Sequence, residues 1–469
     1  MRNPSQIRGD GRVAYAGIRA PMAAVSRTAV QPRVTFWARF APIVAAEAYL
    51  GFTVFIFAFG PWPWPIDNPF TLYTYLIAVQ IALLIGYLTG AGASPAVYTG
   101  KLTESWLLKT SILLNLLWIL PYFYLQIGSQ GLNLSGIVHQ TLLGAADPRQ
   151  AYMQKFEDMN SRNTLVLYAY MFCSPILWMG VPLAIRRWNR ISNTMKAAVA
   201  IIVVANAATW IALGTIKGIA DGAATISISI AATRKSSSRV EKVTTKVGRT
   251  KRLVLVLIAV SALILYFSYA ESSRKKGQLV QYDPGPGISV DVNNVFMAGL
   301  PTGLQATEAN AVSYLCQGYY GLSLALREPF VWSYGIGHSV AMTSIVHKVT
   351  GFDAAELTYM AREQHYGWDM QMRWDSIYPW LASDVTFPGT LIVIFFIGRL
   401  LAVTWVDTRA DASPYAPPLF VMTMLMICYF PANDQFLSAS TTVLAFWGLL
   451  ILWYMKREPN LRRGPGIVR

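Results

Sequence analysis

Two stretches in the second half of the chain concentrate side chains that could do chemistry. The first, Ala361 to Thr390, reads AREQHYGWDMQMRWDSIYPWLASDVTFPGT and places arginine, histidine and aspartate among tryptophan and tyrosine, directly before an apolar run. Aromatic residues alone at such a place are typical of a belt at a membrane edge. A belt does not need interleaved arginine and aspartate. Together these types suit a sugar site, because aromatic rings stack on sugar faces and arginine pairs with phosphate in bidentate fashion.

The second stretch, Tyr314 to Ser339, reads YLCQGYYGLSLALREPFVWSYGIGHS. Its first half has apolar residues at helical spacing, which predicts a helix with one apolar face lying on or just within a membrane interface. Those residues, with Val312 just ahead of the stretch, are Val312, Leu315, Cys316, Tyr319, Leu322 and Leu326. Pro329 is expected to end the helix, and YGIGHS to form a glycine-hinged turn. A plain packing helix at the interface has the same pattern. In either case we predict that the stretch does not cross a bilayer.

The elements around these stretches are predicted to be membrane helices. The chain has 469 residues, of which 54% are hydrophobic and 13% charged, whereas soluble domains carry about 25% charged residues. A crossing helix needs about 20 apolar residues. Ten candidate spans are Ala41–Gly60, Phe70–Thr89, Ser111–Ile127, Thr164–Ile185, Ala197–Ile216, Ile219–Thr233, Leu253–Ala270, Phe387–Val406, Pro418–Phe430 and Leu437–Tyr454. The short span Ile219–Thr233 is also compatible with a buried re-entrant helix.

The placement of basic residues orients these spans. The first forty residues hold seven arginines and one aspartate, the run 234–252 holds eight basic residues and one glutamate, and the last residues are basic again. The positive-inside rule puts all three in the cytoplasm if Ile219–Thr233 crosses. The predicted organisation is a disordered basic tail (1–40), N-terminal spans (41–270), a large extracytoplasmic loop with amphipathic helices (271–386), C-terminal spans (387–455) and a basic tail (456–469). A transit peptide would resemble the first tail in composition.

A few ionisable residues fall inside or at the edge of predicted spans, where charge is expensive and often functional. Lys217 and Asp221 stand four apart in GTIKGIADG, so on a continuous helix they would share a face and pair. Glu47 and Arg399 are each explained as well by a buried structural pair or a snorkelling side chain. The three cysteines show no metal-ligand spacing, and there is no phosphate-binding loop or dinucleotide fingerprint. We predict no metal and no cofactor.

The segments YLCQGYYGLSLAL and YGIGHS, then WDSIYPWLASDVTFPGTL, and the turn GTIKGIADG resemble the bacterial oligosaccharide repeat-unit polymerases. These are the Wzy-like enzymes of O-antigen, capsule and exopolysaccharide assembly. The resemblance covers about residues 41–454. It implies an all-α polytopic, GT-C-like enzyme of the cytoplasmic (inner) membrane, with both termini cytoplasmic. Such an enzyme transfers a growing glycan from undecaprenyl diphosphate to a repeat unit on the same lipid at the outer face. Its expected partners are these two lipid-linked glycans and the bilayer. A chain-length regulator remains open as a further partner, and no nucleic acid is expected.

The resemblance also implies roles, assigned here by residue type and place. Fixed cations would hold the diphosphate leaving group, and the candidates are Lys217, Arg327, Arg362 and Arg373. A carboxylate or neutral histidine would deprotonate the accepting hydroxyl, and the candidates are Asp384 and His338, with Asp221 behind them. Arg373 is counted with Asp384 and His338 as catalytic. The candidates to bind sugar are Tyr319, Tyr320, Trp374 and Tyr378, with Gln317 to orient a hydroxyl.

Three other functions remain open from the sequence. An O-antigen ligase uses the same lipid-linked donor and would share the topology and residue types. A polysaccharide exporter or flippase would need a polar path through the bundle and usually repeated halves, and no internal repeat is evident. A membrane scaffold or channel would not need the chemistry of the two opening stretches. The formal net charge of +15 could suggest nucleic-acid binding. We instead attribute it to membrane topology, because the dense basic runs all fall in segments predicted to be cytoplasmic.

Overall fold

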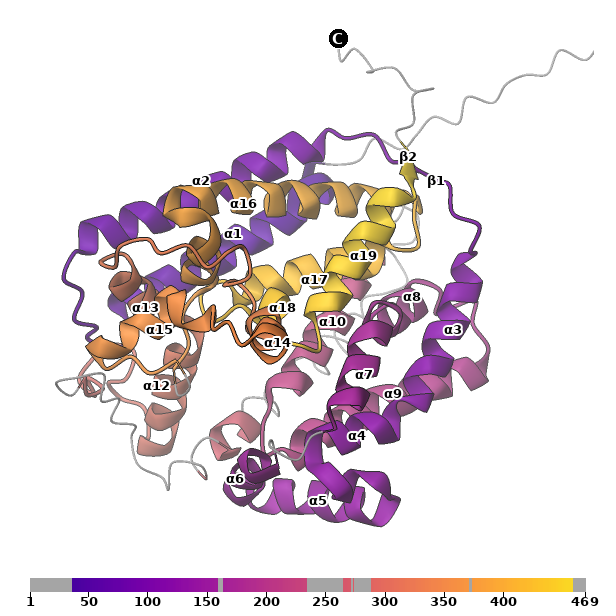
Figure 1. The fold of residues 1–469 in the computed structure, drawn as a ribbon, viewed down its shortest axis with the longest axis horizontal. Helices are drawn as coiled ribbons and strands as arrows, with labels where there is room; N and C mark the ends of the chain where they lie inside the picture. The colour runs from indigo at the N-terminus through magenta and orange to yellow at the C-terminus, as the bar shows by residue number, and fades with distance from the viewer. Residues whose placement is uncertain are drawn as a thin grey trace, which may run out of the picture. The chain divides into compact units, whose positions relative to one another are not determined.

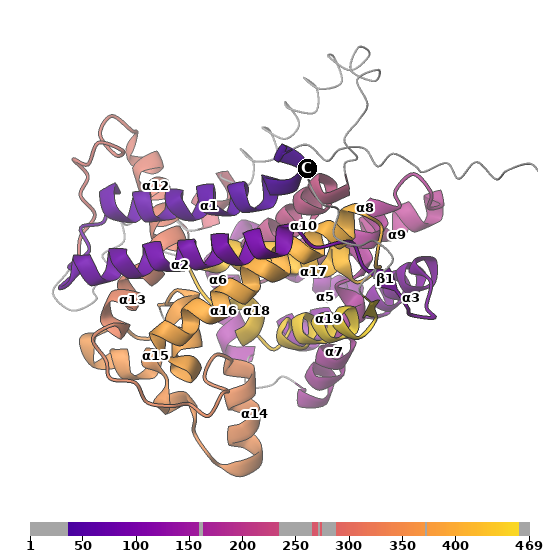
Figure 2. The same ribbon diagram turned by 90° about the horizontal axis from the view of Figure 1, so that it is seen from above.

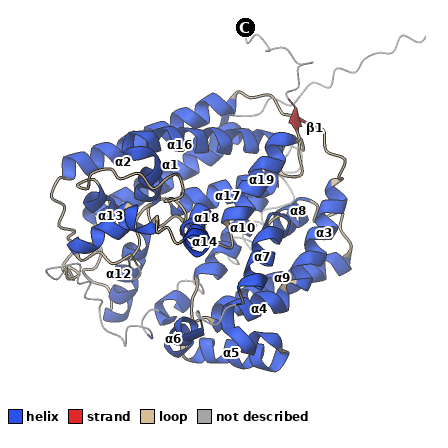
Figure 3. Cartoon of the chain, in the orientation of Figure 1, coloured by secondary structure: helices blue, strands red, loops and turns tan. Residues whose placement is uncertain are grey.

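The computed structural model describes residues 36–158, 163–233, 265–270, 273, 288–370 and 373–458, and these are almost entirely helical (Figures 1 and 3). The described part has one sheet, in which β1 (Val97–Tyr98) pairs antiparallel with β2 (Arg457–Glu458). The predicted tail at residues 1–40 lies outside the described residues up to residue 35. The basic run 234–252, most of the predicted span Leu253–Ala270 and the tail after residue 458 also lie outside them.

Five helices in the described residues are long and apolar enough to cross a membrane. They are α1 (Phe36–Phe59), α2 (Pro69–Ala91), the pair α7 and α8 (Thr164–Leu177 and Gly180–Arg186), α9 (Asn193–Ala212) and α16 (Ile377–Arg409). A sixth crossing is formed if α3 (Glu104–Leu117) and α4 (Ile119–Ile127), which meet at a bend of 46°, count as one span. These match predicted spans and define a mostly helical membrane protein.

The remaining predicted spans are shorter or lie mostly outside the described residues. Helices α17 (Ala416–Tyr429) and α19 (Val443–Met455) are apolar but have only 14 and 13 residues, and α10 (Lys217–Thr233) has 17. At a rise of about 1.5 Å per residue, 14 residues extend only about 21 Å. The number of ten spans therefore stays a prediction.

Helices α2 and α16 pack side by side over most of their length (Figures 1 and 2). Glycines make the close approach possible, because a Cβ added to Gly86 would overlap the carbonyl oxygen of Phe395, and one added to Gly398 would overlap that of Leu83. Small residues at such contacts let the backbones of membrane helices pack without bulky side chains between them. The packing against α2 holds α16 in place, and α16 carries the site described below.

Helix α16 is two helices joined at Thr386, whose backbone has φ 68° and ψ 166°. Pro388 follows two residues later and disfavours a helical conformation at the residue before it. The Thr386 hydroxyl accepts from the Gly389 amide at 3.3 Å and so caps the second part. The predicted span Phe387–Val406 starts at this break. Asp384 therefore belongs to the short first part of α16, outside the long apolar part.

The region between residues 288 and 376 contains short helices. They are α12 (Thr302–Cys316), α13 (Gly318–Ala325), α14 (Val340–Thr350), η4 (Ala355–Leu357), α15 (Tyr359–Arg362) and η5 (Glu363–Tyr366). Helix α13 ends before Pro329, and the following turn has positive φ at Tyr334 (59°) and Gly335 (78°), as predicted for YGIGHS. None of these helices is a candidate span. The shorter pieces elsewhere are η1 (Gly128–Leu132), α5 (Leu134–Ala146), α6 (Pro148–Asp158) and α18 (Gln435–Ser438).

The helices that contain Tyr314–Leu326 are enclosed by protein on more than one side. Four of the six residues of the expected apolar stripe are buried and the other two, Leu315 and Leu326, are partly buried. Ser313, Gln317 and Tyr320, which fall off that stripe, are also buried, at 0%, 1% and 5% exposure. Gly321 explains the tight fit, because a Cβ there would overlap Oδ1 of Asp375. The expectation of a helix with one face on the membrane interface is therefore wrong for this segment.

Candidate functional site

A histidine–aspartate pair lies at the junction of the two stretches singled out by the sequence. His338 Nδ1 is 2.7 Å from Asp384 Oδ2, and the two side chains are 14% and 7% exposed. A ring nitrogen that faces a carboxylate carries the proton, which leaves Nε2 as the acceptor. Nε2 is buried and has no hydrogen-bond partner among the described residues. This is the arrangement of a histidine prepared to accept a proton.

Asp384 also fixes the turn that carries the histidine. Its oxygens accept from the backbone amides of Gly337 and His338, both at 2.9 Å, and Oδ1 lies 2.6 Å from the Ser333 hydroxyl. Such charge-assisted bonds are stronger than neutral ones. Gly337 has to be glycine here, because an added Cβ would overlap the Ser333 hydroxyl oxygen. One carboxylate thus orients the imidazole and ties its turn to α16.

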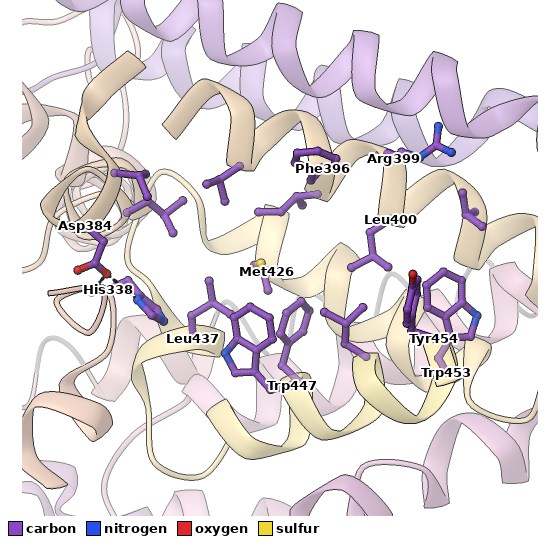
Figure 4. Close-up of a pocket in the computed structure, with 18 of the residues that line it drawn as sticks. His338, Asp384, Phe396, Arg399, Leu400, Met426, Leu437, Trp447, Trp453 and Tyr454 are labelled. Carbon is purple, nitrogen blue, oxygen red and sulfur yellow. Dashed lines mark hydrogen bonds and ion pairs between the residues drawn. The ribbon is translucent and has the colours of Figure 1, made fainter. Parts of the chain in front are cut away.

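A cavity of about 1170 Å³ begins at this pair and extends between α16 and α19 (Figure 4). The pair stands at one end, and Arg399, Trp453 and Tyr454 at the other. The wall between the ends is apolar, formed by residues such as Phe396, Leu400, Met426, Leu437 and Trp447. A cavity with this lining suits an extended hydrocarbon chain with a polar group at its end.

The predicted cations Arg327 and Arg362 gather at a different place. Arg362 Nη1 lies 3.4 Å from Glu328 Oε2 and donates to the Pro329 carbonyl at 2.8 Å. Arg327 pairs with Asp67 and lies 4.4 Å from the centre of the Tyr366 ring. Their charges are therefore largely balanced by neighbouring acids, and neither residue lines the cavity.

Arg373 belongs to a neighbouring polar cluster under the Trp368 ring. Its guanidinium lies 5.2 Å from that ring, and the Trp368 indole donates to Asp375 Oδ1 at 3.1 Å. Asp375 and Glu363 are both fully buried. Burial raises the pKa of Asp375 to about 7, and burial together with the Asp375 charge raises the pKa of Glu363 well above its usual range. Two buried carboxyls in this position share a proton, because both cannot carry charge at low dielectric.

Lys217 and Asp221 form the predicted pair four residues apart, with Nζ and Oδ2 separated by 2.8 Å. The Tyr429 hydroxyl donates to the other oxygen of Asp221. The Lys217 ammonium lies 5.5 Å from the Trp210 ring centre and 5.2 Å from that of Tyr429. This cluster joins α10 to α17, and neither Lys217 nor Asp221 lines the cavity.

The predicted sugar-binding residues are mostly parts of the core. Tyr319 is 1% exposed and its hydroxyl bonds to that of Thr53 at 2.9 Å. Tyr378 is 2% exposed and packs edge-on against Tyr75 and Phe430. These placements favour packing roles for both tyrosines.

The other three candidates sit between the core and the polar cluster. Tyr320 is stacked on Trp64 with ring centres 5.4 Å apart. Trp374 packs edge-on against Tyr314, with ring centres 4.8 Å apart. Gln317 is buried, and its Oε1 has no partner among the described residues, nor has Trp374 Nε1. None of the five predicted sugar-binding residues lines the cavity.

The structure adds residues to the site that the sequence signals did not single out for it. Ser333 bonds to Asp384, and Trp332 and Trp447 line the cavity. Arg457 lies at its far end together with Arg399, which the sequence marked only as an ionisable residue in a span. The basic C-terminal run contained Arg457, but local pattern could not show that it returns to α16.

Comparisons with models of protein families, with characterised proteins and with solved structures find no match to this chain. The fold and the site therefore define a class: a mostly helical membrane protein with an apolar cavity between two apolar helices and a His–Asp pair at one end of it.

Proposed function

We propose that this chain is a repeat-unit polymerase, a glycosyltransferase that elongates surface polysaccharide from undecaprenyl-diphosphate-linked units. It would be a ten-span, GT-C-like protein of the cytoplasmic membrane, with both termini in the cytoplasm and the His338–Asp384 pair at the outer face. The observation that carries the proposal is the continuity of this pair with the apolar cavity. A proton acceptor next to a hydrocarbon channel suits a reaction whose substrates hang on long lipids.

The dimensions support a long lipid chain. Val393 and Val403 both line the cavity and are ten residues apart on the second part of α16, which corresponds to about 15 Å of helix. One leaflet of the hydrocarbon core is roughly 15 Å thick, half of about 30 Å. The cavity therefore runs along at least the depth of one leaflet, and Asp384 and Val385, before the break at Thr386, extend it further.

In the proposed step the hydroxyl of the acceptor's non-reducing sugar gives its proton to His338 Nε2. Its oxygen bonds to the anomeric carbon of the donor glycan, while the bond from that carbon to the diphosphate oxygen breaks. Undecaprenyl diphosphate leaves with the electron pair. Asp384 stabilises the imidazolium that forms, and general-base assistance of this kind contributes about 10²- to 10⁴-fold in rate.

Among the described cations, Arg362 suits the leaving group best. Its Nε and Nη2 are buried without hydrogen-bond partners in the described part of the chain, and the helix that carries it is anchored to α16 where the Tyr359 amide donates to the Ser383 hydroxyl at 3.1 Å. Two free N–H groups on one guanidinium match two phosphate oxygens. Lys217, paired with Asp221 on another helix, is the weakest of the four predicted cations.

The test is deletion of the gene followed by size analysis of surface and lipid-linked glycans, with rescue by variants. Loss of long polymer and accumulation of a single repeat on undecaprenyl diphosphate would establish the polymerase. His338→Gln should then fail to rescue, whereas His347→Gln, at a histidine whose side chain is 55% exposed, should rescue fully. Long polymer that stays on its lipid carrier would instead show a ligase. An unchanged glycan pattern would refute both and favour an exporter or another function.

A further inference from the structure

Arg399 lies at the end of the cavity opposite the His–Asp pair (Figure 4). Arg457 also lines the cavity, and the two arginines have different electrostatic surroundings. Arg457 Nε lies 3.0 Å from Oδ2 of Asp407, whose side chain is fully buried. The Trp453 indole donates to the same oxygen at 3.0 Å. This pair is neutral as a unit, so it adds no net charge to the cavity.

Arg399 is the other arginine that lines the cavity, and its surroundings differ from those of Arg457. Its Nη1 donates to the carbonyl of Thr89 at 3.2 Å. In the described part of the chain no carboxylate lies within ion-pair distance of it. Arg399 is exposed and follows Ile392 and Phe396, which are 61% and 59% exposed, on one face of α16. A cation on an apolar, outward-facing surface of a span is costly unless an anion or water accompanies it.

Arg399 lies ten residues before the end of α16 at Arg409, but its side chain reaches the Thr89 carbonyl near the end of α2. Thr89 lies two residues before the end of α2 at Ala91. On the other side of the cavity Tyr454 is 74% exposed and stands one residue before the end of α19. Tyrosine and tryptophan at helix ends are typical of the headgroup level of a bilayer. Lipid phosphates lie at this depth.

We propose that Arg399 and the adjoining half of the cavity bind an anionic glycerophospholipid. The guanidinium pairs with the phosphate, as its planar fork favours, and one acyl chain lies between α16 and α19 against Leu400, Phe446 and Leu450, which line this cavity. The apolar wall next to the charge favours a phosphate that carries hydrocarbon over an inorganic anion, because only the hydrocarbon can pack against the wall. The site does not depend on the proposed transfer reaction, whose lipid chain would lie in the other half of the cavity, next to the His338–Asp384 pair.

A single interfacial cation is worth about 1 kcal/mol toward an anionic lipid, which corresponds to roughly a fivefold preference. The measurement is native mass spectrometry of the delipidated full chain, titrated with dioleoylphosphatidylglycerol or dioleoylphosphatidylcholine. The wild type should bind the first phosphatidylglycerol about fivefold more tightly. Arg399→Gln should lose that preference. Arg409→Gln should keep it, because Arg409 is on the same helix, lies 5.4 Å from the Trp405 ring, and does not line the cavity.

An unchanged preference in Arg399→Gln, or an equal loss in Arg409→Gln, would overturn the proposal. Displacement of phosphatidylglycerol by millimolar inorganic phosphate would also overturn it, since it would show a site for the anion alone. A second measurement needs no change at Arg399. Phosphatidylglycerol with brominated acyl chains should quench the fluorescence of Trp447 and Trp453 more than brominated phosphatidylcholine at equal concentration, judged by the difference from Trp447→Phe. Equal quenching by the two lipids would contradict the site.

Discussion

The Asp384 carboxylate is predicted to hold the histidine turn closed, and Asp384→Asn tests this most directly. Asparagine keeps the shape but replaces one oxygen by an amide nitrogen that only donates. Whichever way the side chain lies, one of the backbone amides of Gly337 and His338 then faces a donor. Each charge-assisted bond of this kind is worth about 1.5–3 kcal/mol. The free energy needed to open the turn should therefore fall by at least the value of one such bond.

Hydrogen–deuterium exchange of the peptide 333–339 measures this opening. One bond lost at about 1.5–3 kcal/mol corresponds to roughly 10- to 150-fold faster exchange in the peptide. Asp384→Ala, which removes both acceptors, should increase the exchange further. Asp353→Asn is the matched control. That exposed aspartate in the same region accepts from the Ala355 amide at 3.1 Å, and its other contact among the described residues is with exposed His347 at 3.9 Å. Unchanged exchange in both Asp384 variants would refute the idea that this carboxylate fixes the turn.

Two further predictions concern the buried cluster beneath Trp368. Because burial raises the folded-state pKa of Asp375 from an ordinary 3.8 to about 7, the stability it contributes is complete below about pH 4 and is lost as pH rises through about 7. Thermal unfolding in detergent should show a loss of roughly 2–3 kcal/mol of stability from Asp375 between pH 5 and pH 8. Glu363→Gln should remove the further pH dependence that the raised pKa of Glu363 adds. A flat profile in the wild type would contradict the shared proton. Gly321→Ala should destabilise the fold by about 1–3 kcal/mol or more, because the new methyl overlaps Asp375. Gly222→Ala, where an added Cβ meets nothing within 4 Å, is its control, and equal midpoints for the two variants would disprove the close packing.

Features that depend on neighbouring residues could be predicted well. Lys217 and Asp221 pair because residues four apart share a helix face. The helix before Pro329 ends because proline cannot continue it, and glycine at 335 allows the left-handed turn. The long apolar runs became helices because backbone groups in an apolar environment must be satisfied internally. In the site, His338 and Asp384 were both candidates by residue type, although no local pattern paired them.

The prediction of an amphipathic helix at the Tyr314 segment was wrong because it, too, depended on contacts with distant parts of the chain. Helical periodicity shows which residues share a face, but not how many sides of the helix the rest of the protein covers. Ser313, Gln317 and Tyr320 fall off the apolar stripe, yet all three are buried. On the glycine side of α13, Asp375 and Trp368 pack closely against Gly321. Likewise, the predicted cations Arg327 and Arg362 lie away from the cavity, beside acids that other segments supply. Arg373 also lies away from it, against the Trp368 ring.

The sequence by itself determined a helical membrane protein, the ends of several helices, and a loop rich in groups able to transfer protons and bind phosphate. The tertiary structure alone decided which of these groups meet. His338 and Asp384 are 46 residues apart, and the cavity joins α16 to α19, which are separated by the whole of α17 and α18. Local patterns report hydrogen bonding and burial within one element. Contacts between distant elements depend on how their surfaces pack, and only the folded chain shows that packing.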